Sequence, residues 1–237
     1  MAAFKGRHVG CAPGTHEELV NMVSRHVSGR GAVADFGAHS GALLLRLQEI
    51  GFGTLYGIDL DKSRFDLPGA AFASFDLNRP FADKFSQKFD LVTATDVIEH
   101  LDSPRSFLIE IRKLLDENGF VAISLPNVAF FEGRIKFLLH GELWGFGGGN
   151  YLAQRHISPV TKEQMILMMQ EIGLRVVEFR TAGSFATLLR WVLLSPIWLP
   201  IRLVGGPSAL GESAIFLAQK SEPDPELKKP TDYRLRW

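Results

Sequence analysis

One feature constrains the fold of this chain most. It is an apolar run with an aspartate near its end, followed by two closely spaced glycines. Residues 32–36 (AVADF) are typical of a buried strand. Gly37 and Gly41 then let the backbone turn tightly and leave N–H groups open before a helical run begins. A second strand ends on Asp59, where a carboxylate can accept two hydrogen bonds from a ribose. The segment therefore predicts a site for a nucleotide-type cofactor.

The glycine pattern bears on the identity of that cofactor. The dinucleotide fingerprint G-x-G-x-x-G is absent here, and residues 35–41 read D-x-G-x-x-x-G instead. Two glycines alone are better explained by a strand-to-helix turn that needs them only for its geometry. A nicotinamide-dependent oxidoreductase is therefore disfavoured, and the choice of cofactor depends on the segments further along the chain.

Three later segments occur in order after the glycine turn. They are residues 73–78 (ASFDLN), 89–101 (FDLVTATDVIEHL) and 114–127 (LLDENGFVAISLPN). Together with the turn, they resemble the cofactor-binding elements of the class I S-adenosylmethionine-dependent methyltransferases, whose first loop reads Asp/Glu-x-Gly-x-Gly-x-Gly. The resemblance covers residues 30–127, with a looser match to about 180 and again at 214–220. It looks most like the small-molecule branch, which includes ubiquinone-type O-methyltransferases and methyltransferases of glycan and natural-product pathways.

The resemblance implies S-adenosylmethionine as cofactor and S-adenosylhomocysteine as product. Asp59 would bind the ribose, and the strand tip at Asp76 would hold the edge of the adenine ring. The residues expected to bind the cofactor are Asp35, Gly37, Ala38, His39, Gly41, Asp59, Leu60, Asp76, Leu77, Thr95 and Asp96. His39 departs from the family pattern because it replaces the middle glycine, where a side chain narrows the passage for the methionine part of the cofactor. That departure motivates an alternative, a non-catalytic binding or scaffold protein with a methyltransferase fold.

Strands alternate with helices, which predicts an α/β, Rossmann-like, seven-stranded and mainly parallel sheet with helices on both faces. A lid or insertion is expected in the C-terminal half. We expect one methyltransferase domain over residues 1–220, with a core at 30–127, a substrate and lid region at 128–213, and a flexible tail at 221–237. The expected core elements are strands 32–36, 54–59, 71–76, 89–95 and 119–125, and helices 41–50 and 104–116.

The second half contains less regular patterns. Residues 145–151 are too glycine-rich for a helix or strand, so 141–156 is predicted to be a mobile lid. Thr161 and Gln164 form a capping box that starts a helix over 161–172. The apolar stretch 188–204 is too short to span a bilayer and is broken by two prolines. A helical hairpin packed on the domain is favoured over a membrane-surface anchor or a dimer surface.

Composition excludes several kinds of partner and site. Basic and acidic residues balance at 26 each, without the basic patch of a nucleic-acid binder, so no nucleic-acid substrate is expected. The single cysteine, Cys11, cannot form an internal disulfide and has no zinc-binding pattern around it, which fits the reducing cytoplasm and no metal site. The N-terminal residues 1–14 lack the apolar core of a secretory signal and are expected to be a lead-in or a cap.

Methyl transfer to a hydroxyl also needs a base for the acceptor's proton. His156, after the glycine-rich segment, and His100, just after the fourth strand, are the leading candidates, with Glu99 as a third. Each histidine has a structural alternative: His100 would fix the strand exit, and His156 would brace the lid. We expect a small-molecule or glycan acceptor, hydroxyl more than amine, and expect His156 to approach it when the lid closes.

Overall fold

A seven-stranded sheet forms the centre of the structure, a computed structural model that describes residues 3–183, 192, 194–206 and 209–224. In order across the sheet, the strands are β5 (Ala71–Ala73), β4 (Thr54–Ile58), β3 (Ala32–Phe36), β6 (Phe89–Thr95), β7 (Leu115–Pro126), β9 (Ser213–Lys220) and β8 (Leu174–Ala182). Of these strands, β9 alone runs antiparallel to its neighbours on both sides. The predicted mainly parallel, seven-stranded Rossmann-like sheet is confirmed.

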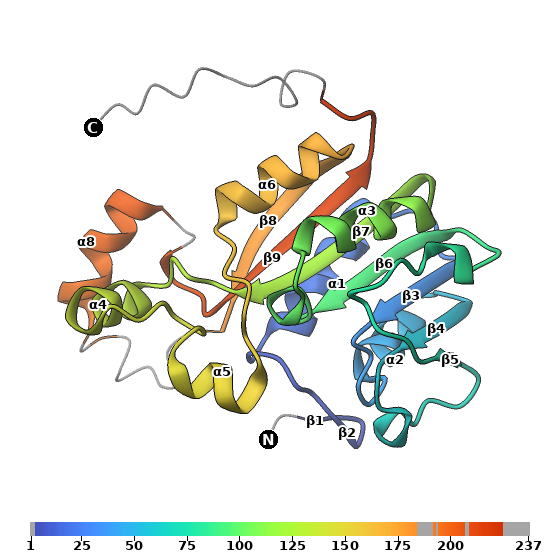
Figure 1. Cartoon of the computed structure of the whole chain (residues 1–237), viewed down its shortest axis with the longest axis horizontal. Helices are drawn as coiled ribbons and strands as arrows, with labels where there is room; N and C mark the ends of the chain where they lie inside the picture. Colours follow the sequence, from blue (N-terminus) through green and yellow to red (C-terminus); the bar gives the residue numbers. More distant parts are fainter. Residues whose placement is uncertain (1–2, 184–191, 193, 207–208, 225–237) are drawn as a thin grey trace.

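Helices cover both faces of this sheet, and a small hairpin precedes it (Figure 1). The helices are α1 (Thr15–His26), α2 (Ala42–Glu49), α3 (Pro104–Leu114), α4 (Phe131–His140), α5 (Gly148–Gln154), α6 (Lys162–Glu171) and α8 (Ser195–Gly205). The hairpin consists of β1 (Ala3–Phe4) and β2 (Arg7–His8), and short 3-10 turns lie at η1 (Lys62–Arg64), η2 (Ala82–Lys84) and η3 (Ile98–His100). Within the described parts of the chain, no helix has both the length and the apolar character to cross a membrane.

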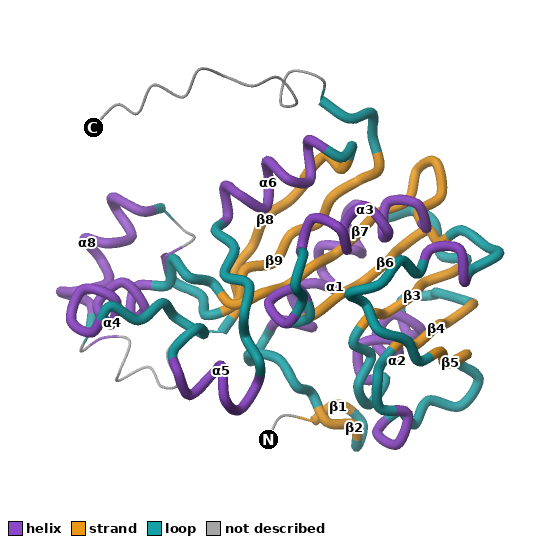
Figure 2. The backbone as a smooth tube through the Cα atoms, in the orientation of Figure 1, coloured by secondary structure: helices purple, strands orange, loops and turns teal. Residues whose placement is uncertain are grey.

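The core is divided between the two faces of the sheet, because side chains along each strand point alternately to one face and the other. Val33 and Leu91 point into one cluster, where they pack with residues of α1 and α2. Their neighbours Ala34 and Val92 point into the other, where they pack with Phe107 and other residues of α3 and α6. Because successive side chains of a strand point to opposite faces, an apolar run in these strands requires helices on both sides. Figure 2 shows the resulting three layers.

Several element boundaries differ from the sequence-based expectation. The predicted strand 71–76 ends earlier, at Ala73, and the predicted helix 104–116 ends at Leu114. β7 starts at Leu115 instead of residue 119, because Leu115 is fully buried and pairs with Phe89 of β6. Tertiary pairing thus overrides the local helical pattern. The start of α6 agrees with the sequence, since Thr161 and Gln164 form the predicted capping box.

The prediction that residues 145–151 form an irregular loop is wrong in part, because α5 begins at Gly148 and continues to Gln154. The glycines occupy its first turn, where the backbone N–H groups have no intrahelical partner in any case. Asn150 donates a hydrogen bond to Gln154 one turn later, at 3.0 Å. None of its residues is buried, so α5 packs loosely on the rest of the molecule.

The prediction that two prolines break the stretch 188–204 is also wrong for its described part. α8 starts at Ser195 and passes through Pro200 without interruption. Pro196 lies in the first turn, which proline tolerates, and both prolines are exposed, so water can solvate the carbonyl that Pro200 leaves unpaired. Trp198 is buried against α4, whereas Trp191 lies outside the described residues.

The tail expected to be flexible from residue 221 is ordered at its start. The Ser221 N–H donates to the Gly173 carbonyl at 2.9 Å, and the Asp224 N–H donates to the Gln170 carbonyl at 3.1 Å. These bonds hold residues 221–224 against the end of α6. Residues 225–237 lie outside the described residues.

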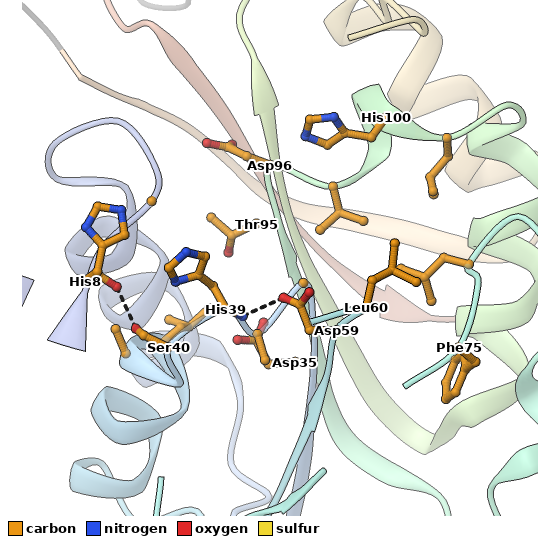
Figure 3. Close-up of a pocket in the computed structure, with 18 of the residues that line it drawn as sticks. His8, Asp35, His39, Ser40, Asp59, Leu60, Phe75, Thr95, Asp96 and His100 are labelled. Carbon is orange, nitrogen blue, oxygen red and sulfur yellow. Dashed lines mark hydrogen bonds between the residues drawn. The ribbon is translucent and has the colours of Figure 1, made fainter. Parts of the chain in front are cut away.

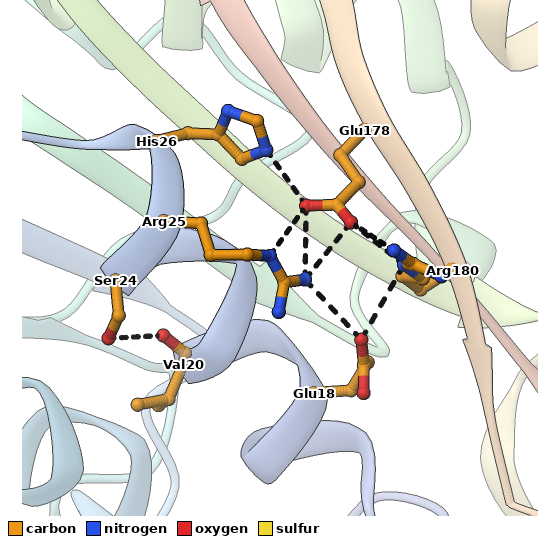
Figure 4. A network of polar contacts seen from close by, with 7 residues as sticks. All are labelled: Glu18, Val20, Ser24, Arg25, His26, Glu178 and Arg180. Carbon is orange, nitrogen blue, oxygen red and sulfur yellow. Dashed lines mark hydrogen bonds and ion pairs between the residues drawn. The ribbon is translucent and has the colours of Figure 1, made fainter.

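An ion-pair network ties α1 to the edge strand β8 (Figure 4). The Glu178 carboxylate accepts hydrogen bonds from Arg25 at 3.0 Å and Arg180 at 2.8 Å, and lies 2.9 Å from Nε2 of His26. Its burial acts to raise its pKa, but the bonds from Arg180 and Arg25 outweigh that effect, so the pKa of Glu178 lies below its usual range. The network therefore stabilises the fold with Glu178 ionised.

We expect Glu178→Gln to lower the free energy of unfolding by about 1–3 kcal/mol, because the two arginines lose a charged acceptor. For a chain of this size, each kcal/mol corresponds to about 2–4 °C in melting temperature. The difference from wild type should be present above the ordinary glutamate pKa and disappear as pH falls through the lowered pKa of Glu178. Thermal melts at several pH values measure this, with the exposed Glu117→Gln as control. Equal melting of Glu178→Gln and wild type near neutral pH would contradict it.

Candidate cofactor and acceptor site

The glycine turn after β3 is held against the end of β4. The N–H groups of Gly37 and Ala38 both donate to the Ile58 carbonyl, at 2.8 and 3.0 Å. Gly37 has a φ of 78°, and a Cβ there would come within 2.4 Å of a Val97 methyl group. Only glycine combines this left-handed conformation with such a close approach. Gly41, at φ 77°, ends the turn directly before α2.

His39 takes a left-handed conformation, with a φ of 44°, in the middle of this turn. Its N–H donates to the Asp59 carboxylate at 2.8 Å, and the second oxygen of that carboxylate accepts from the Asp61 N–H at 3.2 Å. The His39 ring lies against the His8 ring, with 5.1 Å between centroids. Partial burial, followed by the charges of His8 and Arg64, lowers the pKa of His39, so the imidazole is neutral near pH 7.

A cavity of about 370 Å³ opens above the carboxyl ends of β3, β4 and β6 (Figure 3). Every residue expected to bind the cofactor lies in its wall except Gly41, which directly precedes α2. From this set, the wall contains Asp35, Gly37, Ala38, His39, Asp59, Leu60, Asp76, Leu77, Thr95 and Asp96. His100 also lines this cavity. Parallel strands with a crossover between them leave such a crevice at their carboxyl ends.

Two carboxyl groups in the cavity wall are shielded from solvent, Asp35 being buried and Asp96 partly buried. Burial raises the pKa of Asp35 to about 7, although the Thr93 hydroxyl donates to it at 2.7 Å. Burial likewise raises the pKa of Asp96, which accepts from the Ser124 hydroxyl at 2.7 Å and has a φ of 51°. A non-glycine residue in this conformation is strained, and such strain concentrates at functional sites.

The N-terminal residues contribute to the cavity in a way the sequence did not predict. His8, Gly10, His16 and Ser40 all line it. The Ser40 hydroxyl donates to the His8 carbonyl at 2.6 Å, which fixes the hairpin against the glycine turn (Figure 3). Burial lowers the pKa of His16 to about 4, so this histidine is neutral. His8 and Gly10 therefore form part of a cap over the cavity, and a cap is one of the two roles expected for the N-terminal segment.

His100 and His156 lie next to each other, close to Glu99. Their rings contact edge to face with 4.7 Å between centroids. The Glu99 carbonyl accepts from the N–H groups of Ile157 and Ser158, at 2.8 and 3.0 Å, and so fixes the chain just after His156. His156 lines a second, more open cavity that also includes Tyr151.

The tautomer of His156 follows from its hydrogen bond. Nδ1 lies 2.7 Å from the Gly145 carbonyl oxygen, which can only accept, so Nδ1 carries the proton and Nε2 keeps its lone pair. Burial lowers the pKa of His156, the bond to Gly145 raises it in part, and the charge of His100 lowers it further. His156 is thus a neutral imidazole with a free acceptor nitrogen.

Glu99 is fully buried, and neither of its carboxylate oxygens has a hydrogen-bond partner among the described residues. Burial, aided by the charge of Asp96, raises the pKa of Glu99 well above its usual value, which favours the neutral acid. One ligand atom each from Glu99, His100 and His156 lies within 4.8 Å of the other two, so these three are the described side chains that could hold a metal ion together.

A family model described as a methyltransferase domain matches residues 17–179. This chain belongs to the class I S-adenosylmethionine-dependent methyltransferase family. The mitochondrial ubiquinone biosynthesis O-methyltransferase of Dictyostelium discoideum is 30% identical over 151 residues, covering 56% of this chain and 47% of that protein. A ribosomal protein L11 methyltransferase of Desulforapulum autotrophicum is 29% identical over 137 residues, covering 53% and 44%. The chain thus matches slightly less than half the length of these two relatives.

Solved structures show the same methyltransferase fold. One is an S-adenosylmethionine-dependent methyltransferase from Archaeoglobus fulgidus, with a TM-score of 0.58 and 18% identity, covering 87% of this chain and 95% of that one. Another is phosphoethanolamine N-methyltransferase 2 of Haemonchus contortus in complex with S-adenosylmethionine, with a TM-score of 0.58 and 16% identity, covering 89% and 54%. The cofactor of the methyltransferase is S-adenosylmethionine. The residues of the cavity fit it, because Gly37 leaves the start of the turn without a side chain and Asp59 lines the space.

Proposed function

We propose that this methyltransferase transfers a methyl group to a hydroxyl of a small-molecule or glycan acceptor. The observation that carries the proposal is the neutral imidazole of His156, with its free Nε2, in ring contact with a histidine of the cofactor cavity. A hydroxyl acceptor has to lose a proton, and such a nitrogen can take it. The Dictyostelium relative is named an O-methyltransferase, which supports a hydroxyl as the acceptor group. The name of the second relative, a ribosomal protein L11 methyltransferase, indicates a protein acceptor instead.

In this proposal some residues bind the cofactor and others bind the acceptor and accept its proton. S-adenosylmethionine, when bound, supplies an activated methyl group on a sulfonium. Asp59 binds the ribose, and residues 75–77 enclose the adenine. Asp35, which is buried, and Asp96, which is partly buried, line the cofactor cavity and shape its wall. His156 takes the acceptor's proton at Nε2, and His100 holds the acceptor against it.

The described part of the region 128–213 would form the acceptor side of the site; residues 184–191, 193 and 207–208 lie outside the described residues. The second cavity is lined by residues 141–143, 146–148, 151, 156–157 and 159, all within or beside the segment expected to act as a lid. The loose packing of α5 leaves it free to move over an acceptor. The balance of charge across the chain fits a small or neutral acceptor better than nucleic acid.

A transfer assay with methyl-labelled S-adenosylmethionine tests the proposal. The protein is incubated with a small-molecule extract, a glycan fraction and a protein fraction, and label is counted in each. We expect label in the small-molecule or glycan fraction, in a product stable to base, as an ether is and a methyl ester is not. Label confined to the protein fraction would contradict the acceptor class. Cofactor binding without transfer to any fraction would favour the alternative, a non-catalytic binding protein motivated by His39.

The adenine assignment gives a separate prediction at Asp76. One of its carboxylate oxygens accepts from the Asn78 N–H at 2.9 Å, which orients the group at the cavity wall. A carboxylate only accepts, so it should bind the exocyclic amine of adenine and repel the carbonyl of the inosine analogue. We expect the analogue to bind about tenfold or more weakly. Asp76→Asn, which can also donate, should reduce this discrimination; equal affinities in wild type would contradict the adenine assignment.

A further inference from the structure

Large apolar side chains are exposed on α4, α5 and α8; α4 and α8 lie together at one end of the molecule, and α5 lies on the same side of it (Figure 1). We define the outer apolar surface as eight of these side chains: Phe137, Leu138, Leu139, Tyr151, Leu152, Ile197, Leu199 and Leu203. Three of them, one on each helix, are almost fully exposed: Leu138 at 83%, Leu152 at 81% and Leu203 at 78%. Among the other described residues, the exposed large hydrophobic side chains are Leu60, Ile157, Leu167 and Val192.

The same helices already bury another apolar side. Phe131 of α4 and Trp198 of α8 pack together with Phe130 in a small core separate from the two main clusters. α8 therefore carries apolar residues on its inner side, at Trp198, and on its outer side, at Leu199 and Leu203. A helix that is apolar on all sides is expected to be covered on all sides. The outer apolar surface thus indicates a partner that is itself apolar.

The charges around this surface favour an anionic partner. Residues 131–155 and 195–205 contain four basic side chains, Arg134, Lys136, Arg155 and Arg202, against two acidic ones, Glu132 and Glu142. The whole chain has no net charge, so the positive excess is local. Lys136 pairs with Glu142 at 2.8 Å, and the three arginines are exposed. Exposed leucines and aromatic residues on helices that also carry exposed arginines are typical of helices that lie in the interface of a membrane.

We propose that the outer apolar surface docks on the surface of an anionic lipid bilayer. Leu138, Leu152 and Leu203 would enter the boundary between headgroups and acyl chains, and the arginines would contact anionic headgroups. A second copy of the chain is a poorer partner, because a two-fold interface sets the same patch against itself and would bring the arginines of both copies together. Trp198 takes no part in this docking, since it is buried in the small core.

Docking in this way would bring the acceptor side of the protein to the membrane. Tyr151 belongs to the outer apolar surface and also lines the cavity that contains His156. The mouth of that cavity would therefore face the lipid interface. The docking itself follows from α4, α5 and α8 and holds whether or not the acceptor is a hydroxyl.

Vesicle flotation tests the proposal with the full chain. We expect the protein to float with vesicles of phosphatidylglycerol and phosphatidylcholine, and less with phosphatidylcholine alone or at high salt. Leu138→Ser combined with Leu203→Ser should lower partitioning about tenfold or more, because each leucine loses apolar area buried in lipid. Leu167→Ser, on the exposed side of α6, is the matched control and should float like wild type. Arg202→Glu should weaken binding to the anionic vesicles alone.

Three results would overturn this inference. The first is wild-type protein that does not float with anionic vesicles. The second is a double leucine variant that floats as well as wild type. The third is wild-type protein that floats equally well with vesicles that contain phosphatidylglycerol and vesicles that do not. Sedimentation that shows a dimer, lost in the double variant, would assign the surface to a second copy instead. Calorimetric titration with S-adenosylmethionine on each variant shows that the fold and cofactor site are intact, and so separates loss of docking from loss of the proposed activity.

Discussion

Replacing His156 by alanine is expected to lower turnover about 10²–10⁴-fold while leaving the affinity for S-adenosylmethionine close to that of wild type. His156 lines the second cavity, which we propose for the acceptor, and not the cavity proposed for the cofactor, so its loss should affect proton transfer and not cofactor binding. Steady-state kinetics with the labelled cofactor, combined with calorimetry, measures both quantities. His140→Ala, an exposed histidine at the end of α4, is the matched control.

The pH dependence of the rate gives this prediction a second readout. A base has to be neutral, so the wild-type rate should rise as pH passes the pKa of His156 and level off above it. Because burial lowers that pKa, the rise should be centred below the ordinary histidine value of 6.5. Near-normal turnover in His156→Ala would contradict the assignment. A rate abolished by a chelator and restored by a divalent cation would instead assign Glu99, His100 and His156 to a metal site.

Asp59→Ala is expected to weaken S-adenosylmethionine binding tenfold or more, since the ribose loses charge-assisted hydrogen bonds worth about 1.5–3 kcal/mol. The carboxylate also accepts the His39 and Asp61 N–H groups, so its removal loosens the glycine turn as well. Calorimetry gives the affinity, and thermal melting confirms that the variant is folded. Asp61→Ala is the matched control, because Asp61 bonds to Ser63 and does not line the cavity. Unchanged affinity in a folded Asp59→Ala variant would contradict the ribose assignment.

The cofactor side of the site was predictable because its signals are local. A polar residue at or near the end of a strand lies at the carboxyl edge of a parallel sheet, so Asp35, Asp59, Asp76 and Asp96 could be assigned to one edge from their positions in the sequence. Gly37 was predictable for the same reason, since a turn between strand and helix leaves few other residues possible. The structure places these residues in one cavity wall.

The cap over the cavity could not be predicted in the same way. His8 and Gly10 lie in a segment without periodicity, and contacts such as the bond from the Ser40 hydroxyl to the His8 carbonyl hold them at the cavity. This contact joins positions 32 residues apart in the chain. The burial of Glu99, which the sequence indicated only as a third candidate base, depends on the packing of η3 and of residues 157–158.

The region around the second cavity and α8 was predicted least well, because glycine and proline occur there inside helices, which they usually interrupt. Gly148 and Gly149 fall in the first turn of α5, where their cost is small, and Pro200 continues a helix whose exposed carbonyls water can solvate. Residues 130–139 have the apolar spacing of a helix, but that spacing does not tell which of the apolar side chains, such as Leu138, stay exposed. Their arrangement depends on the packing of α4 against α8, which joins segments far apart in the chain.

Calorimetric titration of the wild-type chain with S-adenosylmethionine tests the assignment of the cofactor site most directly. The cavity formed by β3, β4 and β6 should bind one molecule per chain with saturable heat, and S-adenosylhomocysteine should compete for the same site. Asp59→Ala should weaken both ligands in parallel. A folded wild-type chain that gives no binding heat with either ligand, and no rise in melting temperature in their presence, would contradict the assignment of this cavity to the cofactor.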